Sequence, residues 1–244
     1  MKLSAVVLTQ NEEKNIEECL AALAWADEVL VVDSGSEDRT CALAEKHGAR
    51  LIHHPFENFA AQRNFAASNA KGDWLLFIDA DERVTPELAD EIKRTISREA
   101  PRAVYAIPRK NFFFGKLLRF SDACDDAPVR LFPKAHTSWV QPVHEKIETA
   151  LPCRKLKSPI LHYSTRDFAH HKKKTAAYVP LELVTMREKG VRPGLWSVLV
   201  RPLARFFFLY FWKLGILDGI AGFQYAFLSA YYTFEKHWRY WRKA

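Results

Sequence analysis

Residues 73–84 read DWLLFIDADERV, and this stretch decides the fold because an apolar run ends directly in three acidic side chains. The five apolar residues at 74–78 predict a strand over 73–78 that is covered on both faces. Asp79, Asp81 and Glu82 follow at once. Ligands of open parallel sheets bind beyond the carboxyl ends of the strands, so we expect a site here.

The same sequence of apolar strand, polar turn and helix occurs upstream of this stretch. Strands are predicted over 3–9, 28–32 and 50–53, with helices from about residue 16, over 37–47 and over 59–70. A further helix begins at Thr85-Pro86-Glu87, with a cap residue and a proline in the first turn. Alternating strands and helices favour right-handed crossovers, and so predict a doubly wound α/β fold with helices on both faces of a mostly parallel sheet.

The pattern changes after residue 100. Extended segments are predicted over 104–107 and 129–132, with long irregular loops around them. We therefore interpret 1–165 as one domain with halves 1–100 and 101–165, and 166–244 as a helical C-terminal region that is rich in aromatic and basic residues.

The C-terminal region is predicted to lie on a membrane. Its apolar runs are interrupted at Lys213, Asp218 and Gly219, and none reaches the roughly 20 residues that span a bilayer. Arginine, lysine and tryptophan at both ends suit the headgroups of an anionic membrane surface. The alternative is a helical hairpin that packs on the domain or in a homodimer contact.

Composition excludes several classes of protein. The 36 Lys+Arg against 29 Asp+Glu give a formal charge of +7, which favours phosphate-bearing ligands or an anionic membrane. The four cysteines lie far apart and suggest neither a zinc site nor a disulfide framework. No G-x-G-x-x-G follows the first strand and no P-loop motif occurs, which excludes dinucleotide dehydrogenases and P-loop enzymes. A nucleic-acid binder would not need acids at three strand ends.

Polar clusters follow three of the predicted strands: Thr9, Asn11 and Glu12 after the first, Asp33 after the second, and Asp79 and Asp81 after the fourth. Helix caps and turns explain some of them. The spacing of Asp79 and Asp81 also suits a hard divalent cation. With Asp33 accepting hydrogen bonds from a base or ribose and a metal on Asp81 neutralising a diphosphate, the outline is that of a sugar-nucleotide site.

These residues carry a family resemblance. The runs VVLTQNEEKNIEECL, VVDSGSEDRT and AAQRNFAASNAKGDWLLFIDADERV resemble, in order and spacing, the family 2 glycosyltransferases of GT-A fold. The later runs PVRLFPK, VQPVHEKI, ILHYS and RPLARFFFLYFWKLGILDGIAGF resemble the lipopolysaccharide inner-core branch of that family, similar to a β-1,4-glucosyltransferase. The resemblance makes 1–100 the nucleotide-sugar-binding half and 101–165 the acceptor half.

The resemblance also implies roles for single residues. Thr9, Asn11, Glu12 and Asp33 would line the uridine and ribose, and Arg63 would lie near the phosphates. Asp79 would lie near the sugar or ribose, and Asp81 would bind Mg²⁺ or Mn²⁺. Arg130 could hold a diphosphate or an acceptor phosphate. His162 could reach the metal or the pyrophosphate, or it could be a core histidine.

The candidate for the catalytic base lies at a position where the chain differs from the family pattern. The later Glu-Asp motif of many members is not matched, and the chain offers His144-Glu145 instead. Glu145 is the candidate base for an inverting transfer, with Asp125 or Asp126 as substitutes.

The function expected is a metal-dependent transfer of a hexose, glucose from UDP-glucose, onto a heptose of a lipid-linked core oligosaccharide. The protein would act in the cytoplasm as a peripheral enzyme on the inner face of the cytoplasmic membrane. A polyprenyl phosphate or another glycan as acceptor, and a non-catalytic sugar-nucleotide-binding protein, are the alternatives.

Overall fold

The computed structural model describes residues 1–98, 102–124, 126–140, 146–191 and 194–242. It comprises two compact units. The first unit consists of Met1–Arg109 and Ala127–His162, and the second of Lys110–Asp126 and Tyr163–Ala244. The predicted boundary at residue 165 stays a prediction.

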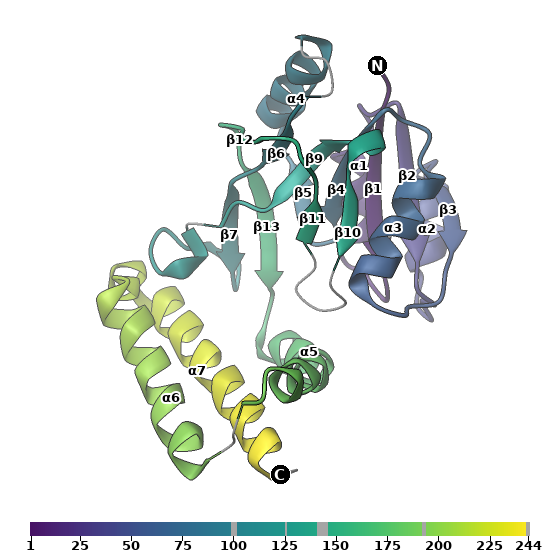
Figure 1. Cartoon of the computed structure of the whole chain (residues 1–244). Coiled ribbons are helices and arrows are strands. Elements are labelled where there is room, and N and C mark those ends of the chain that lie inside the picture. The colour runs from purple at the N-terminus through teal and green to yellow at the C-terminus, as the bar shows by residue number, and fades with distance from the viewer. Residues whose placement is uncertain (99–101, 125, 141–145, 192–193, 243–244) are drawn as a thin grey trace. The chain divides into compact units, whose positions relative to one another are not determined.

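The first unit is built on a seven-stranded sheet in the order β12-β6-β9-β4-β1-β2-β3 (Figure 1). The strands are β1 (Leu3–Thr9), β2 (Glu28–Asp33), β3 (Arg50–His53), β4 (Trp74–Asp79), β6 (Val104–Ala106), β9 (Val129–Pro133) and β12 (Cys153–Lys155). Strands β3, β2, β1 and β4 are mutually parallel. Strand β9 runs antiparallel to both of its neighbours, β4 and β6. The prediction of a mostly parallel sheet is confirmed.

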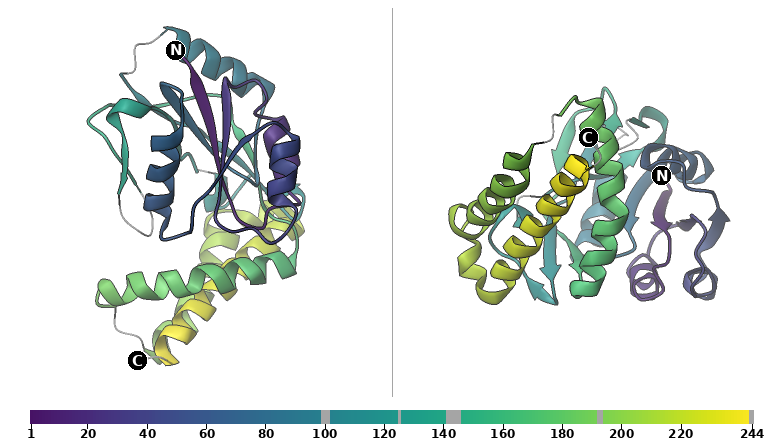
Figure 2. Two further views of the ribbon diagram at one scale, coloured as in Figure 1. Left: turned by 90° about the vertical axis from the view of Figure 1, so that its right-hand side faces the viewer. Right: turned by 90° about the horizontal axis from the view of Figure 1, so that it is seen from below.

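Helices cover both faces of this sheet (Figure 2, left). They are α1 (Ile16–Ala21), α2 (Thr40–Lys46), α3 (Phe59–Asn69) and α4 (Pro86–Arg98). Side chains alternate along β1, so Ala5 and Val7 pack with Ile16 of α1, while Val6 packs with Ala66 of α3 on the opposite face. The doubly wound α/β fold is therefore confirmed.

Shorter strands complete the first unit. Strand β5 (Glu82–Val84) pairs antiparallel with the start of β13 (Ile160–Thr165), and β10 (Ser138–Val140) pairs with β11 (Lys146–Glu148). A short helix η2 (Lys134–His136) follows β9. Of the three boundaries between the units, two fall inside β7 (Arg109–Phe113) and β13, and the third lies between Asp126 and Ala127, before β9.

The second unit is mainly helical. It contains α5 (Phe168–Glu188), α6 (Leu195–Phe207), the π-helical turn η3 (Phe208–Trp212), η4 (Gly215–Asp218) and α7 (Gly219–Arg242), with β8 (Lys116–Leu117) and η1 (Asp122–Cys124). Helices α6 and α7 lie side by side (Figures 1 and 2). The turn between them is tight, because a Cβ added at Gly222 would lie 1.8 Å from the carbonyl oxygen of Gly215. The predicted C-terminal helices are confirmed.

Candidate active site

The candidate site lies in the first unit, where β1, β2 and β4 end side by side. Thr9 at the end of β1 is in register with Asp33 at the end of β2, and Leu8 is in register with Asp79 at the end of β4. Strand pairing therefore brings two of the predicted acidic residues to the same edge of the sheet as Thr9.

Thr9 carries a buried hydroxyl group at the end of β1. Its side chain is buried, and within the described part of the chain its hydroxyl Oγ1 has no hydrogen-bond partner. A buried hydroxyl without a partner is costly, so a ligand atom that bonds to Oγ1 would be favoured.

Asn11 and Glu12 join the loop after β1 to the loop after β2. The Asn11 backbone amide donates to Ser36 Oγ at 2.8 Å, and its side-chain Oδ1 accepts from the Glu37 amide at 2.9 Å. The amide of Glu12 donates to Thr40 Oγ1 at 2.8 Å. Asn11 has a φ of +56°, a conformation that asparagine tolerates better than most residues. The two residues thus shape the rim around Asp33.

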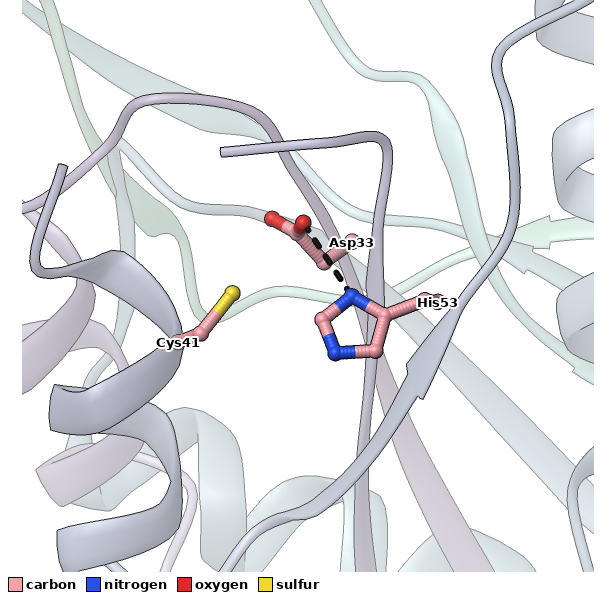
Figure 3. Close-up of side chains that lie close together, drawn as sticks. All are labelled: Asp33, Cys41 and His53. Carbon is pink, nitrogen blue, oxygen red and sulfur yellow. Dashed lines mark ion pairs between the residues drawn. The ribbon is translucent and has the colours of Figure 1, made fainter. Parts of the chain in front are cut away.

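Asp33 is held as a buried carboxylate. It accepts hydrogen bonds from the backbone amides of Gly35 and Ser36 at 2.9 and 2.8 Å and from the Ser36 hydroxyl. Burial acts to raise the pKa of Asp33, but these hydrogen bonds outweigh it and lower the pKa below its usual range. Cys41 and His53 face the same carboxylate (Figure 3). Asp33 is therefore a charged hydrogen-bond acceptor at neutral pH.

Asp79 lies among three guanidinium groups. Arg130 donates to both of its oxygens, Arg109 Nη2 lies 3.2 Å from Oδ2, and Arg63 Nη2 lies 3.7 Å from Oδ1. Burial acts to raise the pKa of Asp79, but Arg130, Arg63 and Arg109 outweigh it and hold the pKa well below its usual range. The carboxylate oxygens of Asp79 are therefore paired with arginine side chains of the protein.

Glu82 completes this charged cluster from a fully buried position. Its Oε1 lies 2.6 Å from Arg109 Nη2 and 3.0 Å from Arg130 Nη2, and its Oε2 accepts from the Asp79 amide at 2.8 Å. Three guanidinium groups thus face two carboxylates, Asp79 and Glu82. The excess positive charge favours an anionic ligand.

Arg63 is fixed by aromatic rings as well as by charge. Its guanidinium lies 4.6 Å from the ring centroid of Trp139 and 5.5 Å from that of Phe77. Trp139 belongs to the core between the sheet and α3, and its backbone exchanges two hydrogen bonds with the Asn64 side chain. Cation–π contacts of this kind hold an arginine in one orientation.

Asp81 and His162 lie beside each other. His162 Nε2 is 3.5 Å from Asp81 Oδ1, and both side chains are mostly buried. The strands bring them together, because His162 on β13 is in register with Glu82 on β5. A carboxylate oxygen next to an imidazole nitrogen is a donor set that fits a divalent cation such as Mn²⁺.

The sequence did not identify Arg109 or the function of Glu82 in the cluster. Arg109 follows Pro108 in a segment without a recognisable motif. Its place beside Asp79 depends on the course of the chain rather than on local spacing.

The candidate base Glu145, with His144 and Asp125, lies outside the described residues. Asp126 is half-buried in the loop before β9. The assignment of the base stays a prediction.

The model of glycosyl transferase family 2 matches residues 4–149, more than half of the chain, and the chain belongs to this family. The family membership and the GT-A fold inferred from the motifs are thereby confirmed.

Two relatives match almost the whole chain. The lipopolysaccharide core biosynthesis glycosyltransferase LpsC of Rhizobium meliloti (strain 1021) is 26% identical over 97% of this chain and 93% of its own. An uncharacterized glycosyltransferase of Rickettsia bellii (strain RML369-C) is also 26% identical, over 96% of this chain and 84% of its own. The protein is thus a glycosyltransferase related at low identity to a lipopolysaccharide core enzyme.

A solved structure has a similar fold over the same length. The crystal structure of S. aureus TarS 1-349 in complex with UDP-GlcNAc covers 98% of this chain and 92% of that chain, with a TM-score of 0.51 and 18% identity. At this identity the likeness concerns the fold.

Proposed function

We propose that the protein is an inverting hexosyltransferase that moves glucose from UDP-glucose onto a heptose of the lipopolysaccharide inner core. The observation that carries the proposal is the similarity to LpsC over 97% of the chain, in a member of family 2. The buried acidic and basic groups at the ends of β1, β2 and β4 support a sugar-nucleotide donor.

In this proposal the donor is bound at the edge of the sheet. Thr9 Oγ1 and the Asp33 carboxylate bond to the uridine, with Asn11 and Glu12 shaping the loop around it. Asp81 and His162 would hold Mg²⁺ or Mn²⁺, which would supply positive charge that neutralises the diphosphate as it leaves. Arg63 and Arg130 supply further positive charge for the phosphates. Asp79 lies near the sugar or ribose and holds these two arginines in place through its ion pairs.

The transfer step needs one proton acceptor. Glu145 takes the proton of the acceptor hydroxyl while that oxygen attacks the anomeric carbon from the face opposite the diphosphate. The bond to the diphosphate breaks as the new glycosidic bond forms, so the anomeric configuration inverts.

The second unit supports a membrane location for this reaction. Large apolar side chains are exposed along α6, η3, η4 and the first half of α7, among them Trp196, Leu203, Phe211, Trp212, Ile220 and Phe227. Trp196, Trp212 and Ile220 are 77%, 79% and 78% exposed. Among the described residues, Leu195–Trp212 is also long and apolar enough to cross a membrane by length and composition alone. We propose that this surface, the apolar helix surface, binds the cytoplasmic leaflet, where a lipid-linked acceptor is found.

The donor and acceptor are tested with purified full-length protein. Release of nucleotide diphosphate is measured with a panel of sugar nucleotides, with and without Mn²⁺, and with heptose-containing core acceptor or a polyprenyl phosphate. Metal-dependent UDP release from UDP-glucose that requires the core acceptor is expected. Turnover with the polyprenyl phosphate alone would contradict the proposed acceptor.

The membrane surface is tested by flotation with vesicles that contain anionic lipids. The double variant W196E/W212E should shift the protein from the vesicle fraction to the soluble fraction, because both indoles lose their place at the interface. The matched control A21E/A24E adds the same two negative charges at exposed positions of the first unit and should float like wild type. Unchanged flotation of W196E/W212E, with a changed oligomeric state in light scattering, would show that the surface is a homodimer contact.

A further inference from the structure

A second cluster of metal-binding side chains lies at the edge of the same sheet, apart from Asp81 and His162. Asp33, Cys41 and His53 each point a ligand atom toward a common point, and these atoms all lie within 4.8 Å of one another (Figure 3). His53 Nδ1 is 3.5 Å from Asp33 Oδ2. The wide spacing of the cysteines in the sequence gave no sign of this cluster.

The backbone presents these three side chains from regular elements. Asp33 ends β2 and His53 ends β3, and the two residues are in register across the parallel pair. Cys41 is the second residue of α2. The donors therefore come from fixed positions, while the exposed His53 ring is able to adjust by rotation about its side-chain bonds.

We propose that Asp33, Cys41 and His53 form a binding site for one Zn²⁺ ion or a similar divalent transition-metal ion. Binding of this ion and binding of the nucleotide of the sugar donor would exclude each other, because both use Asp33. One carboxylate, one thiolate and one imidazole are the donors that zinc prefers, and water fills the fourth position. Mg²⁺ prefers oxygen ligands and does not compete for a thiolate. The second part of the proposal rests on the donor site described above.

The electrostatics of the cluster favour a cation. The Asp33 carboxylate, with its ligand oxygen within 4.8 Å of the Cys41 sulfur and of the His53 ring nitrogen, supplies a negative charge for a bound cation. Binding of the thiol releases one proton: the Cys41 S–H bond breaks, the sulfur binds the cation, and the proton leaves to solvent. His53 binds through Nδ1 and keeps its proton on Nε2. Asp33 retains its hydrogen bonds from Gly35 and Ser36.

Co²⁺ provides the test, because its bond to a thiolate gives a charge-transfer absorption in the near ultraviolet. Titration of the full-length protein with Co²⁺ should produce this band with one ion per chain, and Zn²⁺ should abolish it while Mg²⁺ should not. The band should disappear in C41S and persist in the control C153S, whose thiol is exposed. Loss of one imidazole in H53A should weaken Co²⁺ binding about tenfold or more, whereas the control H47A should not.

Competition is read from the same absorption band. Added UDP should decrease the band, and Zn²⁺ should raise the KM for the donor in wild-type protein but not in C41S. Absence of the band, or its persistence in C41S, would overturn the site. A band that UDP does not change would overturn the competition. A band in a protein that transfers no sugar would leave the site standing and refute the proposed function instead.

Discussion

The buried cluster around Glu82 makes a quantitative prediction about stability. Glu82 is completely buried and faces the guanidinium groups of Arg109 and Arg130 at 2.6 and 3.0 Å. The substitution E82Q removes its charge and leaves three guanidinium groups with Asp79 as their remaining carboxylate partner in the cluster. Removing one partner of a buried ion pair costs about 3–5 kcal/mol, because the other charge stays buried without compensation.

We expect E82Q to lower the free energy of unfolding by about 3 kcal/mol, the lower end of the range for a broken buried ion pair. Glutamine keeps a carbonyl oxygen that is able to accept one hydrogen bond from an arginine or from the Asp79 amide. A loss of about 3 kcal/mol corresponds to roughly a hundredfold increase in the unfolded fraction. For a chain of this length, each kcal/mol lowers the melting temperature by roughly 2–4 °C, so the first unit should unfold about 6 °C or more below wild type.

Differential scanning calorimetry of the full chain measures this shift, and E18Q is the matched control. Glu18 also pairs with an arginine, Arg83 Nη2 at 3.1 Å, but its side chain is 78% exposed. Exposed pairs contribute about 0–1 kcal/mol, so the control should melt close to wild type. Equal melting temperatures for E82Q and E18Q would refute the view that Glu82 compensates buried charge.

Three further predictions concern the site. D81N should lose metal-stimulated turnover, because the carboxylate proposed to anchor the cation becomes a neutral amide; equal stimulation by Mn²⁺ in wild type and variant would contradict this. E145Q should bind donor normally, by calorimetric titration, while turnover falls about 10²- to 10⁴-fold; near-normal turnover would move the base to Asp125 or Asp126. Because the pKa of Asp79 is held well below its usual range, its contribution to stability is complete above about pH 4 and is lost only as the pH falls further. Urea unfolding of D79N should therefore show a flatter pH dependence than wild type below pH 4, and a difference in slope that is confined to pH 5–7 would be inconsistent with this pKa.

Local sequence patterns predicted the first half of the fold well. Strands β1 and β4 each form an apolar run that stops at a polar turn, while β3 has only Leu51 and Ile52 as apolar residues between Arg50 and His53. The predicted ends of all three strands differ from the structure by at most one residue. The helix predicted over 37–47 instead begins at Thr40, because Asp38 accepts the Thr40 amide and hydroxyl and forms the turn before it.

Long-range pairing was beyond the reach of these patterns. The sequence places Asp79 and Asp81 only two residues apart and suggests one shared cation. In the structure Asp79 faces arginines while Asp81 faces His162, because β9 brings Arg130 and β13 brings His162 from more than fifty residues away along the chain. Similarly, Cys41 and His53 meet at Asp33 through strand register, which cysteine spacing does not reveal.

The antiparallel strand β9 has a consequence for how the protein is made. Residues 74–76 on β4 pair with residues 131–133 on β9, so the centre of the sheet is completed only after the ribosome has passed residue 133. Until then β4 exposes an unpaired edge in an apolar strand, which is a template for aggregation. A chain that stops near residue 100 would keep the motif DWLLFIDADERV and still lack the strand that covers it. We therefore expect soluble expression of residues 1–100 to require β9 as well, and nascent chains that end before residue 133 to depend on chaperones.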